Sequence, residues 1–322
     1  MNNEGLGPFR LAPWFSPRPW GRWDLQPWYG PEAFARTSEP VGEAWLTGPA
    51  SVVETGALTG QTLAAVVDEQ TEAVLGDGGG EEFPLLVKLL FPSDKLSVQV
   101  HPDDTQAQAM GQPRGKTECW YVLEAEPGAT IMLGLKPAAT VDAVRAAIAD
   151  GTLEELMEFV PVAAGDMVFV DAGTVHAIWP GAILLETQQN CDLTYRMYDY
   201  GRPRELHIEK SLEATKLVTR AGKIAPTVLA DRTVLIDVEY FRVERLVVDG
   251  KRSSETLASG TDTGLCYLFA ADGAGRLVGS DFEPLDLPAR GIVAVPANSP
   301  TFVVEDLGGL ELIRIAPNWP AK

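Results

Sequence analysis

The sequence has few residues of the two types most often used for metal binding and disulfides. Its 322 residues include three histidines and three cysteines, the latter at Cys119, Cys191 and Cys266. An odd number of cysteines without regular spacing argues against a disulfide framework. Free cysteines are typical of a reducing compartment, so we expect a cytoplasmic protein.

Long apolar runs and a basic leader are also missing. No stretch of the chain approaches the roughly 20 consecutive apolar residues that a membrane helix requires. The first residues, MNNEGLGPFR, have neither the basic start nor the apolar core of a signal peptide. We therefore expect no membrane partner and no secretion.

Positive charge is scarce. The chain has 26 Lys and Arg against 45 Asp and Glu, which gives a formal net charge of −19. Such an acidic surface repels DNA, RNA and anionic membranes, so nucleic acid is excluded as an expected partner. The same field repels phosphorylated molecules at long range. A site for a phosphorylated substrate would therefore need a local cluster of Lys and Arg.

Turn residues and short apolar runs are abundant. The chain has 31 glycines and 24 prolines. From Phe83 onward, apolar runs of about four to eight residues are bounded by Pro, Gly, Asp or Glu, which is typical of successive short strands. Helical patterns precede these runs at about 61–75 and interrupt them at about 140–158 and 204–216. We predict a mainly β fold with short helical insertions.

A second strand-rich region follows residue 222. Its turn signals recur about every 8–14 residues, a spacing typical of a jelly-roll barrel or sandwich. We therefore divide the chain into an N-terminal catalytic domain, residues 1–222, and a C-terminal β domain, residues 223–322.

Three segments carry candidate metal ligands. Alternate residues of a strand share a face, so Gln99 and His101 should point the same way, as should Lys116 and Glu118. The segment from Gly165 to His176 reads as a strand, a tight turn at Gly173 and then a histidine. Two imidazoles, a carboxylate and an amide oxygen suit Zn²⁺, with Mn²⁺, Fe²⁺ or Co²⁺ as alternatives. A strand histidine can equally be a core residue, and spacing alone leaves both interpretations open.

Several motifs together resemble the type I phosphomannose isomerase family of the cupin superfamily. Residues 165–176 are similar to the second cupin motif, with Asp171 where the motif has Pro. The first cupin motif is represented by Gln99, His101 and Glu118, with Gln in place of its first His and a long insertion before the Glu. The matching stretches are LSVQVHPDD at 96–104, KTECWYVL at 116–123, LETQQNCDLTYRMYDYGR at 185–202 and ELHIEKSL at 205–212.

The resemblance implies a fold of two cupin-like jelly-roll β-barrels or sandwiches and one zinc ion per chain. The implied zinc ligands are Gln99, His101, Glu118 and His176. The family's catalytic Arg matches Arg196. Two family lysines match Lys116, a candidate catalytic and substrate-binding residue, and Lys88, a candidate substrate-binding residue. Two departures lie near the N-terminus, at Ala44, where members often have Ser, and at Arg22, where a Gly is usual. No histidine follows residue 207, so the C-terminal domain is expected to be a cupin without metal ligands.

The implied reaction interconverts mannose 6-phosphate and fructose 6-phosphate through an enediolate. Arg196 would supply positive charge to the developing oxyanion. Glu186 is the first candidate for the base, with a salt-bridge partner of Arg196 or Lys116 as the alternative interpretation. Lys116 and Arg202 are candidates for the phosphate group, and a solvated turn residue is the alternative for Arg202. We expect His207 to be a capping or packing residue.

Other functions remain compatible with the same motifs, because one fold supports many chemistries. One is a cupin isomerase or epimerase that acts on another sugar phosphate. A second is a sugar-binding cupin that keeps the metal without catalysis. A third is a dioxygenase, which would use iron bound by two histidines and a carboxylate.

Overall fold

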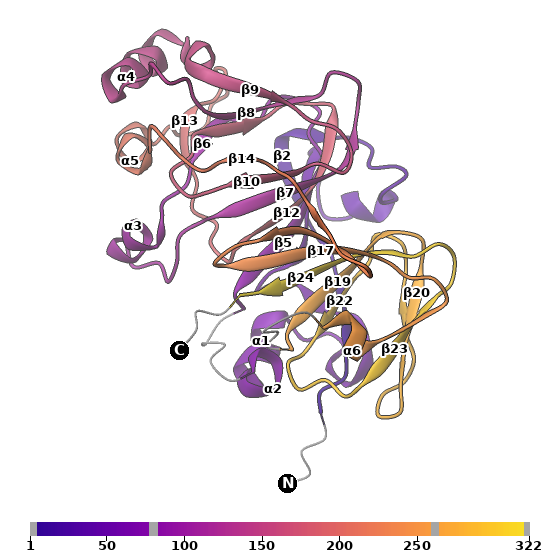
Figure 1. Ribbon diagram of the computed structural model, residues 1–322. Helices are drawn as coiled ribbons and strands as arrows, with labels where there is room; N and C mark the ends of the chain where they lie inside the picture. The colour runs from indigo at the N-terminus through magenta and orange to yellow at the C-terminus, as the bar shows by residue number, and fades with distance from the viewer. Residues whose placement is uncertain (1–4, 77–82, 259–263, 319–322) are drawn as a thin grey trace. The chain divides into compact units, whose positions relative to one another are not determined.

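The computed structural model describes residues 5–76, 83–258 and 264–318 (Figure 1). The chain forms two compact units, each built from segments that are distant in sequence. Unit 1 comprises residues up to Trp14, Trp45–Leu86 and Ala225 onward, and unit 2 comprises Phe15–Ala44 and Val87–Ile224. Among the described residues, no helix combines the length and apolar character needed to cross a membrane.

Unit 2 contains a five-stranded sheet and most of a seven-stranded sheet. The five-stranded sheet has the order β13 (Tyr195–Tyr198), β6 (Val98–Val100), β11 (His176–Ile178), β8 (Thr130–Leu135), β9 (Met157–Pro161). The seven-stranded sheet has the order β14 (Gly222–Ile224), β10 (Met167–Val170), β7 (Glu118–Ala125), β12 (Ala182–Gln189), β5 (Leu85–Leu90), β3 (Val41–Thr47), β2 (Trp14–Arg22). These strands confirm the prediction of a mainly β fold.

The two sheets of unit 2 pack on each other. One buried cluster joins Trp120 and Leu184 of the seven-stranded sheet with Ile131 and Ile178 of the five-stranded sheet. Burial of such side chains stabilises a fold by roughly 1.5–3 kcal/mol each, before the cost of chain entropy. Because this core lies between the facing sides of the two sheets, polar side chains from both sheets can meet beside it.

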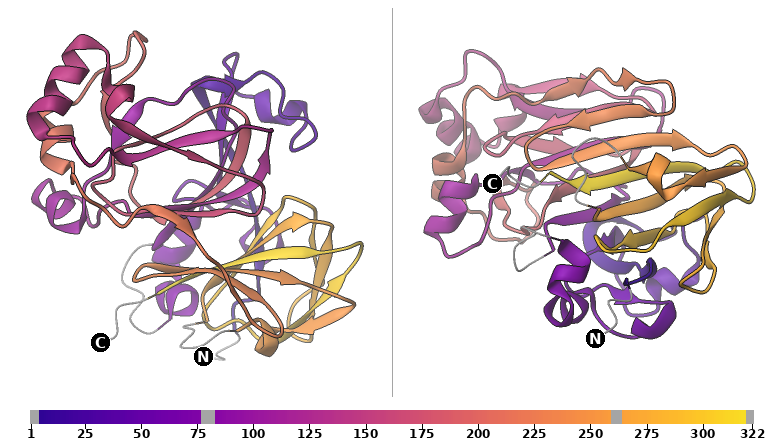
Figure 2. Two further views of the ribbon diagram at one scale, coloured as in Figure 1. Left: turned by 45° about the horizontal axis from the view of Figure 1, so that its top comes forward. Right: turned by 60° about the horizontal axis from the view of Figure 1, so that its bottom comes forward.

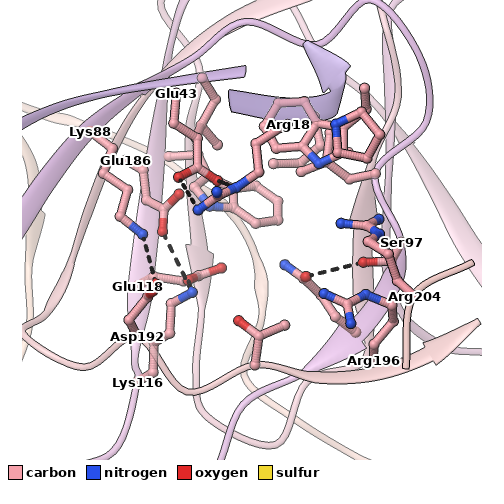
Figure 3. Close-up of a pocket in the computed structure, with 18 of the residues that line it drawn as sticks. Arg18, Glu43, Lys88, Ser97, Lys116, Glu118, Glu186, Asp192, Arg196 and Arg204 are labelled. Atoms are coloured by element: carbon pink, nitrogen blue, oxygen red, sulfur yellow. Dashed lines mark hydrogen bonds and ion pairs between the residues drawn. The ribbon is translucent and has the colours of Figure 1, made fainter. Parts of the chain in front are cut away.

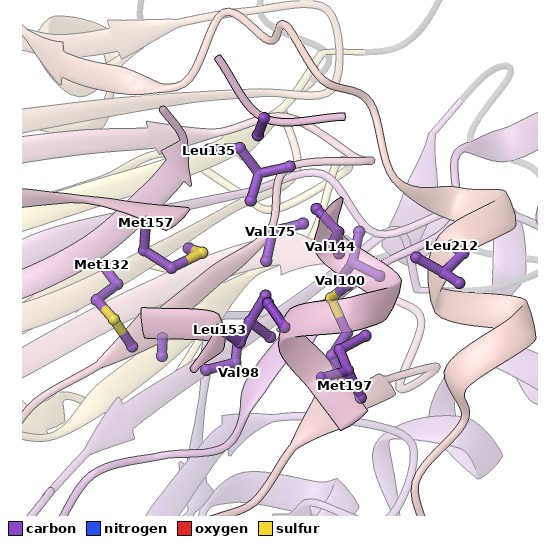
Figure 4. Close-up of a cluster of buried hydrophobic side chains, with 14 of the residues drawn as sticks. Val98, Val100, Met132, Leu135, Val144, Leu153, Met157, Val175, Met197 and Leu212 are labelled. Carbon is purple, nitrogen blue, oxygen red and sulfur yellow. The ribbon is translucent and has the colours of Figure 1, made fainter. Parts of the chain in front are cut away.

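Short helices gather on one side of unit 2 (Figures 1 and 2). They are α3 (Asp104–Ala109), α4 (Val141–Asp150), the 3₁₀ turn η3 (Leu153–Leu156) and α5 (Ile208–Ala214). Helix α4 is capped at its N-terminus by Thr140, whose hydroxyl accepts from the Ala143 N–H, and at its C-terminus by Gly151 in a left-handed conformation. A second core lies beneath these helices, where Val144 and Leu212 meet strand residues such as Val98 and Val100 (Figure 4).

Unit 1 contains the other two sheets. An eight-stranded sheet has the order β15 (Thr227–Val228), β16 (Thr233–Asp237), β17 (Phe241–Val247), β24 (Glu311–Pro317), β19 (Cys266–Asp272), β22 (Ile292–Val295), β1 (Phe9–Ala12), β4 (Val52–Val53). A four-stranded sheet has the order β18 (Lys251–Ser253), β23 (Phe302–Asp306), β20 (Gly275–Gly279), β21 (Leu285–Leu287). None of the four sheets formed by the described residues closes on itself, so the sandwich alternative describes the units better than the barrel.

The helical patterns outside unit 2 are short. The run predicted at 61–75 forms two helices, α1 (Leu63–Glu69) and α2 (Thr71–Leu75), because Gln70 departs from helical geometry. Unit 1 also contains α6 (Ser254–Leu257) and the 3₁₀ turn η2 (Gly56–Leu58), and unit 2 contains a further 3₁₀ turn, η1 (Pro31–Phe34). The chain passes from unit 2 to unit 1 between Ile224 and Ala225. Segments from both sides of residue 222 contribute to unit 1. The division into two domains at this residue stays a prediction.

A buried ion pair lies in the sheet of unit 1. Glu244 of β17 and Arg314 of β24 are paired across the ladder, and both are almost completely buried. An Nη1 of Arg314 donates to Glu244 at 3.1 Å, and Arg242 and Arg232 also reach this carboxylate. Burial lowers the pKa of Arg314 to about 10, although Glu244 favours its charged form. The face of this sheet that carries the buried core thus holds an ion pair, and the described residues of this part of the chain include no histidine.

Gly173 is a position where only glycine fits the backbone. Its φ of 92° lies in the region that L side chains avoid, and an added Cβ would lie 2.7 Å from the Lys216 side chain and 3.0 Å from the Ala214 carbonyl. Gly165 has nearly the same φ, 91°, with nothing within 4 Å. We expect Gly165→Ala to lose about 1–2 kcal/mol of unfolding free energy from backbone strain. Gly173→Ala should lose more, because crowding is added.

Urea unfolding of the two variants and the parent chain measures this difference. Equal losses for Gly173→Ala and Gly165→Ala would show that crowding against Lys216 and Ala214 has no cost. Gly173 also donates its N–H to the carbonyl of His101 at 2.9 Å. Gly173→Ala should therefore also displace His101, an effect that Gly165→Ala should not share.

Candidate active site

Three buried side chains converge in unit 2. One ligand atom each from His101, Glu118 and His176 lies within 4.8 Å of the others. The Nε2 of His176 is 3.3 Å from Oε1 of Glu118, and the Nε2 of His101 is 3.6 Å from its Oε2. All three residues are at most 1% exposed. The structure therefore brings together three of the four metal ligands expected from the sequence.

Strand register accounts for the convergence. His176 of β11 pairs with Gln99 of β6, and Glu118 begins β7 in the facing sheet. The amide nitrogen of Gln99 lies 3.2 Å from Nε2 of His176. Gln99 and His101 thus share a face, as strand alternation predicts. Because the amide nitrogen of Gln99 faces His176, a ligand role for its oxygen stays a prediction.

Both imidazoles are held in the tautomer that a metal ligand needs. The Nδ1 of His101 donates to the Leu193 carbonyl, and the Nδ1 of His176 donates to the Thr174 carbonyl, each at 2.9 Å. A carbonyl oxygen only accepts, so the proton sits on Nδ1 and each Nε2 keeps its lone pair. Burial and the nearby Lys116 lower the pKa of His101 well below its ordinary value. Burial lowers the pKa of His176 to about 4. Both rings are therefore neutral at pH 7.

Unsatisfied polar atoms mark the point where a cation would bind. Among the described residues, the buried Nε2 of His101 has no hydrogen-bond partner, and Oε2 of Glu118 has none beyond the ion pair with Lys116 Nζ at 3.4 Å. A buried polar atom without a partner costs about 1–3 kcal/mol. Two neutral imidazole nitrogens and a carboxylate form a set typical of a divalent metal with an open position. The residues present thus fit a metal ion.

A cavity of about 470 Å³ opens beside Glu118 and Gln99 (Figure 3). Lys88, Lys116, Glu118, Glu186 and Asp192 lie on one side of it, and Ser97, Arg196 and Arg204 lie on the other. This volume is in the range of small-molecule sites. Five cationic and four anionic side chains line the cavity. The local balance therefore opposes the strongly negative net charge of the chain.

Lys116 links the carboxylates of one wall. Its Nζ lies 3.4 Å from Oε2 of Glu118 and 3.9 Å from Oε1 of Glu186. Burial alone would lower the pKa of Lys116, but these two carboxylates raise it above its ordinary value. Burial raises the pKa of Glu186 to about 7, although Lys88 and Lys116 oppose the shift. Glu186 therefore has the pKa of a proton-transfer group at neutral pH.

Arg196 lies on the opposite wall. Its Nη1 donates to the Glu205 carbonyl at 2.9 Å, and its buried Nε has no hydrogen-bond partner among the described residues. Burial lowers the pKa of Arg196, and the positive charge of Arg204 lowers it further. The backbone N–H of Arg196 donates to Nδ1 of His207, which precedes α5. His207 thus lies at the start of a helix, and its ring accepts a backbone hydrogen bond.

The structure does not bring Arg202 to the cavity. Its Nη2 donates to the Lys95 carbonyl, its Nε lies 3.0 Å from Asp199, and its guanidinium lies over the Tyr200 ring. Arg204, two residues later, lines the cavity in its place while paired with Asp199. The turn after β13 sets the directions of the Arg202 and Arg204 side chains. Residue spacing in the sequence does not predict the conformation of this turn.

Arg18 and Glu43 are cavity residues that the sequence did not single out. The Nε and Nη2 of Arg18 each donate to a Glu43 oxygen at 3.0 Å, in the bidentate geometry of an arginine–carboxylate pair. Arg18 lies two residues before Trp20 on β2, and both line the cavity. Strand alternation gave no signal for Arg18, because Pro17 and Pro19 line the cavity as well as Arg18 and Trp20. The partner Glu43 comes from the neighbouring strand β3.

Comparisons with known proteins agree with this geometry. The model of the type I phosphomannose isomerase catalytic domain matches residues 9–132. The chain is 33% identical over 315 residues to a protein named probable mannose-6-phosphate isomerase GmuF of Bacillus subtilis, covering 92% of this chain and 96% of that protein. It is 39% identical over 227 residues to a mannose-6-phosphate isomerase of Streptococcus mutans, covering 66% of this chain and 71% of that protein.

Solved structures extend the likeness to the whole fold. A mannose 6-phosphate isomerase from Bacillus subtilis superposes with a TM-score of 0.82 at 31% identity, covering 96% of this chain and 99% of that one. A putative mannosephosphate isomerase from Archaeoglobus fulgidus shares the fold with a TM-score of 0.75 at 21% identity, covering 98% and 99%. Sequence identity above 30% across nearly the full length of both chains establishes kinship, and the chain belongs to the type I phosphomannose isomerase family.

Proposed function

We propose that this chain is a zinc-dependent isomerase that interconverts mannose 6-phosphate and fructose 6-phosphate. The observation that carries the proposal is the convergence of three buried metal-binding side chains beside a cavity that also contains Glu186, Lys116 and Arg196. The metal would be held by His101, Glu118 and His176, with Gln99 as the fourth ligand. When bound, it would supply Lewis-acid polarisation to oxygens of the sugar.

The reaction moves one proton between neighbouring carbons. A base removes the proton from C2 of the open-chain aldose, and the electron pair forms an enediolate. The hydroxyl proton passes from O2 to O1, and the proton held by the base returns to C1, which leaves the C2 carbonyl of the ketose. Glu186 is proposed as this base, because its carboxylate is buried and its pKa near 7 makes both protonation states accessible. If Glu186 were only a structural partner of Lys116, its substitution would lower stability without a large loss of kcat.

Positive groups would offset the charge that develops. Arg196 is proposed to stabilise the enediolate oxygen, since its Nε faces no other partner among the described residues. Lys116 and Lys88 are proposed substrate contacts from the other wall of the cavity. For the phosphate, Arg204 and Arg18 are better placed than Arg202, because both line the cavity.

Zinc removal should abolish activity and lower stability. A metal present at 100 times its dissociation constant stabilises a protein by about 2.7 kcal/mol, because it binds only the folded state. We expect chelation to lower both the isomerase rate and the melting temperature, and added zinc to restore both. His176→Ala should purify without zinc, whereas His207→Ala should keep one zinc per chain. Full activity in the chelated protein would refute the metal-dependent reaction.

Glu186→Gln should reduce kcat while leaving the zinc content unchanged. Removal of a proton-transfer group costs about 10²–10⁴-fold in rate. The base must be ionised, so kcat of the parent chain should fall as the pH drops below about 7, in line with the pKa of Glu186. This limb should vanish in the variant. Glu205→Gln, at an exposed carboxylate, is the control. A loss of stability without a large loss of kcat would assign Glu186 a structural role.

Arg196→Met and Arg202→Met separate the two arginines. Loss of one group that stabilises a transition-state oxyanion costs about 10²–10³-fold in kcat. We therefore expect such a loss in kcat/KM for Arg196→Met. Arg202→Met should stay near the parent value, because Arg202 bonds to Lys95 and Asp199 outside the cavity. Steady-state kinetics with mannose 6-phosphate measures both. The reverse order would restore Arg202 as a substrate contact.

A further inference from the structure

The loop between β12 and β13 reaches the metal site through its backbone. This loop, residues 190–194, carries the Leu193 carbonyl that accepts from Nδ1 of His101 at 2.9 Å. The corresponding acceptor for His176 is the carbonyl of Thr174, two residues away on the same segment. His176 is thus oriented locally, whereas His101 depends on a loop 92 residues distant in sequence.

One buried side chain holds the start of this loop. Gln188 is 0% exposed, and its Nε2 donates to the carbonyl of Cys191 at 2.6 Å and to that of Gln189 at 3.0 Å. Gln188 pairs with Glu118 across the β12–β7 ladder, so the two side chains lie on the same face. Gln188 therefore lies beside the proposed ligand Glu118. It also holds the loop whose Leu193 carbonyl accepts from His101, a second proposed ligand.

The hydrogen bonds continue from Cys191 to Leu193. Burial raises the pKa of the Cys191 thiol, and a hydrogen bond from the Leu193 backbone N–H opposes that shift. The N–H of Leu193 thus donates to the sulfur of Cys191, and the carbonyl of Leu193 accepts from the ring of His101. No element of regular structure covers residues 190–194, so the loop is held by contacts such as these and by the backbone hydrogen bond from the Cys191 N–H to the Gln189 carbonyl at 2.7 Å.

We infer that Gln188 is a positioning residue for the metal site, acting through the 190–194 loop on the ring of His101. This inference rests on the metal-binding part of the proposed function. Loss of the Gln188 amide would leave the Cys191 carbonyl buried without its donor. The loop would relax, the Leu193 carbonyl would shift, and the imidazole of His101 would lose the contact that aims Nε2 at the metal.

The predicted effect is weaker metal retention. Partners that orient a ligating histidine typically contribute roughly 10–100-fold to metal affinity. Gln188→Met keeps the size of the side chain and removes its donors. We expect zinc to leave this variant roughly 10–100 times faster than the parent chain. Cys191→Ala, which removes the next link, should accelerate release in the same direction by a smaller factor.

The experiment follows zinc transfer from the loaded full-length protein to an excess of a chromophoric chelator, without substrate. Leu268→Ala is the control, because it creates a cavity in the core of unit 1, whereas the metal-binding residues and the loop belong to unit 2. Its zinc release should match that of the parent chain at equal distance below the melting temperature. The visible spectrum of the Co²⁺-loaded forms gives a second readout, and only the loop variants should change it.

The outcomes separate the two proposals. Zinc release from Gln188→Met at the parent rate, with an unchanged Co²⁺ spectrum, would overturn the positioning role while leaving the isomerase in place. A parent chain that holds no zinc would overturn the proposed function itself. If Gln188→Met does not fold, Cys191→Ala decides the question, since parent-like release from that variant would overturn the inference.

Discussion

The site depends on the burial of one carboxylate. Glu118 is taken almost completely out of water, and its charge is balanced on one side by Lys116 at 3.4 Å. On the other side stand two imidazoles that burial keeps neutral. The desolvation cost of a buried carboxylate beside one ammonium and two neutral rings is only partly offset, so a nearby cation would stabilise it. The strands, the Gly173 turn and the helices around them hold this arrangement, and a divalent cation would complete it.

Much of this arrangement could be read from the sequence. Strand alternation placed Gln99 with His101 and Lys116 with Glu118, because the period of two is a local property of the backbone. The resemblance to a family supplied the long-range contact of these segments with His176, which spacing alone could not give. The mainly β fold with short helical insertions is confirmed for the same reason, since short apolar runs between turn residues are local signals.

What the sequence missed depends on contacts between distant segments. Arg202 and Arg204 are nearly adjacent, and only the turn after β13 decides which of them faces the cavity. Arg18 and Glu43 come from neighbouring strands whose pairing no periodicity reveals. The helix predicted at 61–75 is divided because the backbone at Gln70 leaves helical geometry, which propensity does not register. For the arginines and for Glu43, contacts between segments that are distant in sequence decide which side chain reaches the cavity.

The ion pair in the sheet of unit 1 limits how this second sandwich could evolve. Removing one member of a buried pair costs about 3–5 kcal/mol, because the other charge is left without a partner. A single substitution of Glu244 or Arg314 by histidine would therefore be penalised before any metal could bind. Two or more coordinated changes would be needed at once, and Arg232 and Arg242, which also contact Glu244, would need new partners. A metal centre at this position is therefore costly to reach by single substitutions, because each step leaves a buried charge without its partner.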